Sequence, residues 1–118
     1  MVDIDIIYGE NDLSADEYRL LREDAGWKTL PDEQIKASLE ASNYVVTARK
    51  NGEIVGMARC LTDGVYIAYV FDVVVSSKYR SCGIGKIIME RVINHFIEEN
   101  RFLMQIVLLA VSSDVEEF

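Results

Sequence analysis

The spacing of apolar and polar residues predicts a short strand followed by two helices in the first third of the chain. Isoleucines and a tyrosine at residues 4–8 form the strand. Ser14, with Glu17 three residues later, has the spacing of a capping box, and Gly26 ends the apolar side of this first helix. A second helix is predicted over 31–41, because proline is favoured in a first helical turn.

The middle of the chain changes to the texture of β-strands. Residues 44–50 and 53–61 are predicted strands, and the Asn51-Gly52 pair between them is the strongest short signal for a hairpin. A second reversal at Asp63-Gly64 leads into a third long strand over 65–75. These three strands are expected to form an antiparallel meander.

The last third is predicted to add one helix and one strand. Residues 104–111 are continuously apolar, which is typical of a buried parallel strand. Together with the meander this predicts an α/β fold, with a mixed, mainly antiparallel sheet and helices on both faces. The helix is marked by apolar residues at a spacing near 3.6, namely Ile84, Ile87, Ile88, Val92, Phe96 and Ile97.

Length and charge limit the classes of function. The 118 residues are enough for one domain with a single core. The formal net charge of −8 argues against nucleic acid as a partner, since phosphates require clustered Lys and Arg. It suits an amine substrate, although an acidic surface is also an ordinary means of solubility. No segment resembles a membrane span or a signal peptide.

The two cysteines indicate neither a disulfide framework nor a metal site. Cys60 and Cys82 have no CxxC or Cys/His spacing. We therefore expect a soluble, cytoplasmic protein with reduced thiols and no metal.

The connector at residues 76–82, which leads into the long helix, is the segment that indicates a binding site. N–H groups at a helix start lack acceptors within the helix, and the helix dipole adds partial positive charge there. Gly83 and Gly85 let a ligand approach the backbone, while Arg80 and Lys86 flank the turn with positive charge. The arrangement suits a pyrophosphate, although a glycine-rich turn that only permits close packing is an alternative.

The segment resembles the signature of the GNAT N-acetyltransferase superfamily. That signature is Arg or Gln, two residues, Gly, one residue, and Gly or Ala, and this chain has Arg80-x-x-Gly83-x-Gly85 after Asp72-Val73-Val74-Val75. The predicted order of strand, two helices, meander, signature helix and strand is also similar to that of the family. The resemblance covers nearly the whole chain.

The resemblance implies acetyl-CoA as co-substrate and an amine, on a small molecule or a peptide, as acceptor. The pantetheine arm would pair with the strand that precedes the signature, and the thioester would lie near residues 107–110. The residues implied in binding are Val73 and Val75 for the arm, and Arg80, Ser81, Cys82, Gly83, Ile84, Gly85 and Lys86 for the pyrophosphate.

Direct attack of an amine on the thioester requires a base. Asp72 is the candidate, acting directly or through water, because it is the carboxylate in the strand nearest the thioester. The alternative is that Asp72 only hydrogen-bonds a neighbouring turn.

The resemblance also implies residues beyond the given sequence. Members of the family commonly carry a Phe-Tyr pair on the helix after the last predicted strand, and Phe118 falls at the phenylalanine. The tyrosine that would act as acid, the rest of its helix and two strands, roughly 30 residues, would follow. We therefore expect a C-terminally truncated domain spanning residues 1–118. The alternative function is a CoA-binding or self-associating module with weak catalysis.

A homodimer is expected through the strand at 104–111. Without the strands that would follow, this strand leaves a long apolar edge that invites a second chain. Light scattering would test this expectation, since a monomer contradicts it.

Overall fold

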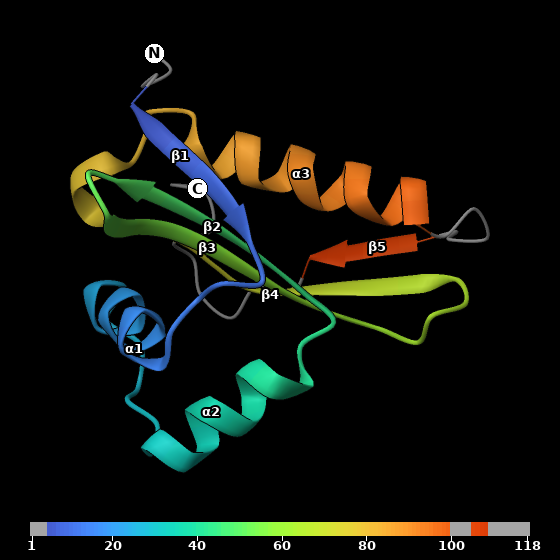
Figure 1. Ribbon diagram of the computed structural model, residues 1–118, viewed down its shortest axis with the longest axis horizontal. Coiled ribbons are helices and arrows are strands. Elements are labelled where there is room, and N and C mark those ends of the chain that lie inside the picture. The colour runs from blue at the N-terminus through green and yellow to red at the C-terminus, as the bar shows by residue number, and fades with distance from the viewer. Residues whose placement is uncertain (1–4, 100–104, 109–118) are drawn as a thin grey trace.

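The computed structural model describes residues 5–99 and 105–108 of the 118-residue chain (Figure 1). The element order predicted from the sequence is confirmed in these ranges, with a short 3-10 helix, η1, added before the long helix. The elements are β1 (Ile6–Glu10), α1 (Ala15–Asp24), α2 (Asp32–Ala41), β2 (Tyr44–Lys50), β3 (Glu53–Thr62), β4 (Ile67–Val75), η1 (Ser77–Tyr79), α3 (Ile84–Glu99) and β5 (Gln105–Leu108).

The strands form one sheet in the order β1-β2-β3-β4-β5. The pairs β1–β2, β2–β3 and β3–β4 are antiparallel, and β5 pairs with β4 in parallel. The mixed, mainly antiparallel sheet is therefore confirmed. Hairpins join β2 to β3 and β3 to β4, whereas α1 and α2 lie between β1 and β2, and η1 and α3 lie between β4 and β5.

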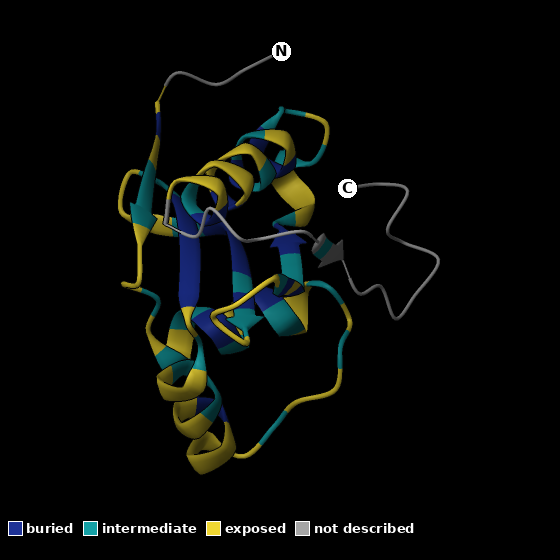
Figure 2. Ribbon diagram, turned by 90° about the vertical axis from the view of Figure 1, so that its right-hand side faces the viewer, coloured by how far each residue is buried: buried dark blue, intermediate teal, exposed yellow. Residues whose placement is uncertain are grey.

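Helices cover both faces of the sheet, as the sequence predicted. Side chains of α3, among them Ile88 and Val92, pack against one face, where Val46, Ala58 and Val70 are fully buried. On the other face, α1 and α2 bury a second cluster that includes Tyr18, Leu21, Ile35, Met57 and Val74. Figure 2 shows the buried strand residues enclosed between these two layers.

The bounds of β1 and β4 differ most from the prediction. β1 begins at Ile6 and extends to Glu10; Ile4 lies outside the described residues. β4 begins at Ile67 rather than at residue 65, because the Asp63 carboxylate accepts the N–H groups of residues 65, 66 and 67 at 2.9 to 3.2 Å. An Asx-type turn thus takes the donors that the predicted strand would have used.

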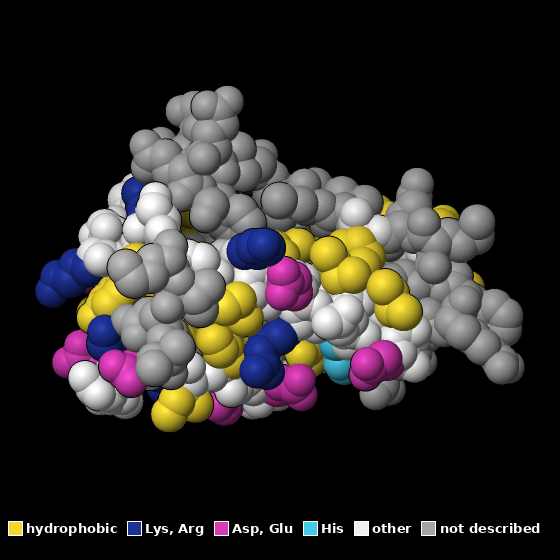
Figure 3. Space-filling model, turned by 90° about the horizontal axis from the view of Figure 1, so that it is seen from above, with side chains coloured by type: hydrophobic (Ala, Val, Ile, Leu, Met, Phe, Trp, Pro, Cys, Tyr) yellow, Lys and Arg dark blue, Asp and Glu magenta, His cyan; other side chains and the backbone are white. Residues whose placement is uncertain are grey.

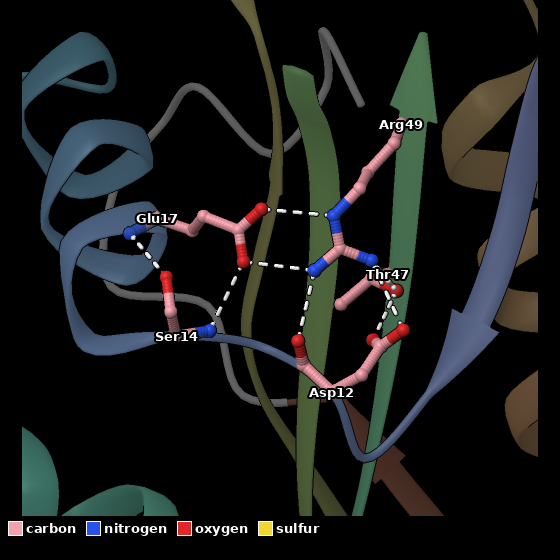
Figure 4. A network of polar contacts seen from close by, with 5 residues as sticks. All are labelled: Asp12, Ser14, Glu17, Thr47 and Arg49. Atoms are coloured by element: carbon pink, nitrogen blue, oxygen red, sulfur yellow. Dashed lines mark hydrogen bonds and ion pairs between the residues drawn. The ribbon is translucent and has the colours of Figure 1, made fainter. Parts of the chain in front are cut away.

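A polar network fastens the start of α1 to the sheet (Figure 4). The guanidinium of Arg49 donates to both carboxylate oxygens of Glu17 at 2.8 Å. It also donates to Asp12, whose other oxygen accepts the hydroxyl of the buried Thr47 at 2.7 Å. Ser14 and Glu17 complete the predicted capping box. One strand arginine therefore fixes both the loop before α1 and the helix's first turn.

The first turn of α3 lies very close to β3. A Cβ added to Gly56 would lie 3.0 Å from the Cδ1 of Ile88 and 3.1 Å from the Cγ2 of Ile84. Gly56 is opposite Val75, the last residue of β4. The glycine therefore lets α3 begin directly above the end of the strand that leads into it.

The outer surface of α3 carries acidic and basic side chains beside apolar ones (Figure 3). Ile93 and Ile97 are exposed there. None of the helices in the described ranges has the length and apolar composition needed to span a bilayer. The predicted homodimer stays a prediction; within the described part of the chain, β5 is the edge strand next to β4.

The Glu17–Arg49 pair should contribute measurably to stability. Glu17→Gln removes a bidentate charge-assisted contact between side chains that are 20% and 22% exposed. We expect the free energy of unfolding to fall by about 2 kcal/mol in urea titrations. Asp16→Asn is the matched control in the same helical turn, because its partner contact involves a carboxylate that is 91% exposed and should change stability by less than about 0.5 kcal/mol.

The same pair predicts a pH dependence. The hydrogen bonds from Arg49 lower the pKa of Glu17 below its ordinary value of 4.5. The unfolded chain therefore takes up this proton first as the pH falls, and the pair's stabilisation, complete above the ordinary pKa, is lost as the pH falls through the lower folded value. Stability of the wild type should fall more steeply below about pH 4.5 than that of Glu17→Gln, and parallel curves would contradict this.

Candidate functional site

The connector between β4 and α3 is fastened to the body of the protein at several points. The N–H of Ser76 donates to Val55 at 2.8 Å. Ser77 donates its N–H and its hydroxyl to the two carboxylate oxygens of Asp24, at the end of α1, at 2.7 and 2.8 Å. The ring of Tyr79 lies under the ammonium of Lys50. The connector therefore delivers the chain to α3 in a fixed position.

The turn that follows has the geometry of an anion cradle. Ser81 and Gly83 adopt left-handed backbone conformations, with φ of 67° and 83°, on either side of Cys82. Alternating conformations of this kind turn successive N–H groups toward one point. Within the described residues, the N–H groups of 81–86 donate to no acceptor, and the first bond of the helix runs from Ile87 to the carbonyl of Gly83. Unbonded donors and the helix dipole thus act at the same place.

β4 contains a β-bulge just before this turn. Arg59 of β3 pairs with Phe71 and Met57 pairs with Val74, so Asp72 and Val73 together lie opposite the single residue between them in β3. Asp72 has a φ of 51°, the left-handed region that residues other than glycine rarely adopt. The bulge changes which face each later side chain of β4 occupies.

β4 has different neighbours along its two halves. Residues 67–70 pair in parallel with β5. From 71 to 75, no strand in the described ranges pairs with β4 on the side away from β3. The part of β4 predicted to meet the pantetheine arm, which includes Val73 and Val75, therefore lies beyond the end of the β4–β5 pairing. Of the predicted thioester region, residues 109 and 110 lie outside the described residues.

Three side chains from two other elements meet at the carboxylate of Asp72. The hydroxyl of Tyr18 donates to Oδ2 at 2.6 Å, and Nε of Arg59 donates to the same oxygen at 3.0 Å. A guanidinium nitrogen of Arg22 lies 3.6 Å from Oδ1. The three charged side chains are only 14% to 15% exposed. Burial, and then the hydrogen bond to Asp72, raise the pKa of Tyr18 above its ordinary value of 10.0, so its hydroxyl remains a donor.

The same arginines continue into the helical layer. Arg59 also donates to the carbonyl of Ser38 at 3.2 Å and to the hydroxyl of Ser42 at 3.3 Å, at the end of α2. Arg22 donates to the carbonyl of Lys28 in the segment between α1 and α2. The Asp72 cluster, by which we mean Asp72 with Tyr18, Arg22 and Arg59, thus connects both N-terminal helices to β3 and β4.

These contacts bear on the role predicted for Asp72. Both of its carboxylate oxygens already face donors from α1 and β3, and its side chain is 15% exposed. A general base has to reach the proton that it removes. The arrangement resembles the alternative in which Asp72 serves a structural contact, although the partners come from a helix and a strand and not from a turn. Catalysis by Asp72 stays a prediction.

Sequence reasoning missed the partners of Asp72. Arg59 offered one signal, because a charged residue in the middle of an apolar strand requires a counter-charge on the same face. Tyr18 and Arg22 are spaced four residues apart on α1, which places them on one side of the helix. Only the β3–β4 register, set by the bulge, shows that all three reach one carboxylate.

The remaining candidates have other surroundings. Burial raises the pKa of the Cys60 thiol to about 12, so this residue is a packing group. His95 is partly buried and stacks on Tyr44, with ring centroids 3.6 Å apart. Tyr66 and Tyr69 are 48% and 37% exposed, so neither belongs to the buried core.

Comparison with known proteins now decides the family. The model of the Acetyltransferase (GNAT) family matches residues 10–115, a range that includes β2 to β5, the turn and α3. The chain belongs to the GNAT acetyltransferase family. The resemblance noted in the sequence is confirmed.

Comparison with individual relatives shows how much of their length this chain covers. An uncharacterised N-acetyltransferase of Porphyra purpurea is 28% identical over 98 residues, which are 78% of this chain and 56% of that protein. A histone acetyltransferase of Glycine max is 27% identical over 117 residues, 89% of this chain and 49% of that protein. The chain thus spans about half the length of these curated relatives. A probable acetyltransferase of Staphylococcus aureus has the same fold, with a TM-score of 0.84 at 21% identity over 94% of this chain and 84% of that one.

The turn geometry makes two substitutions act in opposite directions. Gly83→Ala places a side chain at a φ of 83° and should lower the free energy of unfolding by about 1 kcal/mol. Ser81→Gly relieves a left-handed serine at 67° and should raise it by about 0.5 kcal/mol, after the cost of a more flexible unfolded chain. Urea unfolding measures both, and equal effects of the same sign would contradict the conformations described.

Proposed function

We propose that this chain binds acetyl-CoA along residues 73–86 and supports transfer of the acetyl group to an amine. The observation that carries the proposal is the run of unbonded N–H groups at residues 81–86, which begins with the left-handed Ser81 and Gly83 and ends in the first turn of α3. Membership of the GNAT family supports an N-acetyltransferase function.

The pyrophosphate would occupy the turn. Its negative charge is stabilised by the donors of 81–86, by the positive end of the α3 dipole and by the ammonium of Lys86. The guanidinium of Arg80 is held near the end of β4, because its Nε donates to the carbonyl of Val75 at 3.4 Å. Cys82 and Ile84 contribute their backbone to the turn, while the side chain of Ile84 is buried under the helix.

The pantetheine arm would lie along the second half of β4. Its amide groups can pair with the backbone of Val73 and Val75 as an added strand does, because the β4–β5 pairing ends at residue 70. This places the thioester at the point where the two strands separate. Residues 107 and 108, the last described in β5, lie beside residues 69 and 70 at that point.

The reaction would be direct attack of a neutral amine nitrogen on the thioester carbonyl. The carbon–nitrogen bond forms, the carbon–sulfur bond breaks, the amine gives up a proton and the thiolate gains one. A main-chain donor at the strand separation can stabilise the oxyanion that forms. The amine proton passes to a base or to a water chain, the role for which the sequence offered Asp72.

The acceptor is proposed only as a class. The chain has a net charge of −8, which favours approach of a protonated amine before it loses its proton. One relative is named as a histone acetyltransferase, an enzyme whose acceptor is a protein amine. A panel of small amines, amino sugars and basic peptides therefore covers the chemistry to be tested.

Calorimetry with CoA tests the pyrophosphate site when one negative charge is introduced into the turn. Gly83→Asp puts a carboxylate inside the turn and should weaken CoA binding at least about 100-fold, because the new charge faces the pyrophosphate. Gly64→Asp is the matched control. It has the same change of charge at a similar left-handed φ of 76°, in an exposed loop with nothing within 4 Å of an added Cβ.

The control should bind CoA like the wild type. If the wild type shows no binding at millimolar CoA, the proposal fails, and equal loss in both variants would place the phosphate elsewhere. Release of thiol from acetyl-CoA with the amine panel then separates a transferase from a protein that only binds CoA.

A further inference from the structure

We propose that Asp72 is a positioning residue, and that the Asp72 cluster holds β4 in the bulged conformation that its Val73–Val75 segment needs to receive the pantetheine arm. This inference rests on the proposed function. It assigns to Asp72 a role that acts through the backbone and not through proton transfer.

The backbone of Asp72 has an unusual conformation that its side-chain contacts maintain. Asp72 is held at a φ of 51°, a left-handed conformation that is unfavourable for L-residues, although aspartate tolerates it better than most. Such a conformation persists where surrounding contacts determine it. Here a hydrogen bond of 2.6 Å from Tyr18, one of 3.0 Å from Arg59 and the nearby Arg22 do so.

The contacts to the Asp72 carboxylate come from α1 and from β3. Tyr18 and Arg22 belong to α1, and Arg59 belongs to β3, the strand on which β4 forms its bulge. The carboxylate is therefore drawn toward the helical layer. Because Asp72 and Val73 share one position opposite β3, the pull also sets the orientation of the residues that follow.

The orientation of residues 73–75 depends on the bulge. Residues 71–75 lie beyond the β4–β5 pairing, so β3 is the one described strand that fixes their register. If the cluster is broken, the bulge can relax or move along the strand, and the edge offered to the arm changes. The turn at 81–86 should change little, because it is held separately through Val55, Asp24 and Gly56.

The two halves of the ligand therefore respond differently to a break in the cluster. CoA carries the pantetheine arm, whereas 3′-phospho-ADP is the nucleotide half alone. Asp72→Asn keeps the shape and tolerance for left-handed backbone but removes the charge. We expect its dissociation constant for CoA to rise about tenfold, a change of about 1.4 kcal/mol, while that for 3′-phospho-ADP stays within about twofold of the wild type.

Two further variants keep the test decisive. Asp72→Gly adopts the left-handed conformation without strain but has no anchor, and it should lose CoA affinity as Asp72→Asn does. Tyr18→Phe removes one donor and keeps the buried ring, and it should weaken CoA binding about threefold. Glu17→Gln is the control, because it breaks the other polar network of α1 and should leave both affinities unchanged.

Each outcome decides between the roles. Wild-type affinity for CoA in Asp72→Asn and Asp72→Gly overturns the proposal, and so does equal weakening of both ligands, which would mean only a general loss of structure. If the wild type binds neither ligand, the proposed function itself has failed. In thiol release, Asp72→Asn should be slower with an unchanged pH profile; a flattened alkaline rise would show that Asp72 is the base.

Discussion

The structure depends on the left-handed backbone at Asp72, because β4 has to serve different neighbours along its length. Its first half pairs with β5 in parallel, its whole length pairs with β3 in antiparallel fashion, and its end leads directly into the turn before α3. A regular strand would keep one register throughout. The bulge allows the second half to change orientation while Met57 and Val74 remain paired.

The conformation is maintained by a small number of polar contacts within an apolar sandwich. A carboxylate and two guanidinium groups, each about 15% exposed, would be costly if any one lacked its partners. Tyr18 supplies a neutral donor that remains protonated because its pKa is raised. The cluster thereby links the helices on one face of the sheet to the strand that faces the proposed cofactor, and any acceptor held by those helices would be held relative to the same strand.

Much of the fold could be predicted from the sequence, because short-range signals set it. Asn51-Gly52 fixed one hairpin, the Ser14–Glu17 box fixed the start of α1, and the apolar stripe fixed α3. The glycine turn could be predicted for the same reason, since its chemistry lies within a few consecutive residues. The Asp72 cluster could not be predicted, because the partners of Asp72 are 13 to 54 residues away from it and meet it only when the β3–β4 register is known.

Hydrogen–deuterium exchange with and without CoA reports along the whole chain which backbone groups the ligand protects. If CoA binds as proposed, peptides that cover residues 73–86 should exchange more slowly, because the strand edge and the turn have N–H groups that are not bonded within the protein. Peptides from β1 and β2 should exchange as before, since β3 separates these strands from β4. Protection confined to other segments, with exchange at residues 73–86 unchanged at saturating CoA, would contradict CoA binding along β4 and the turn.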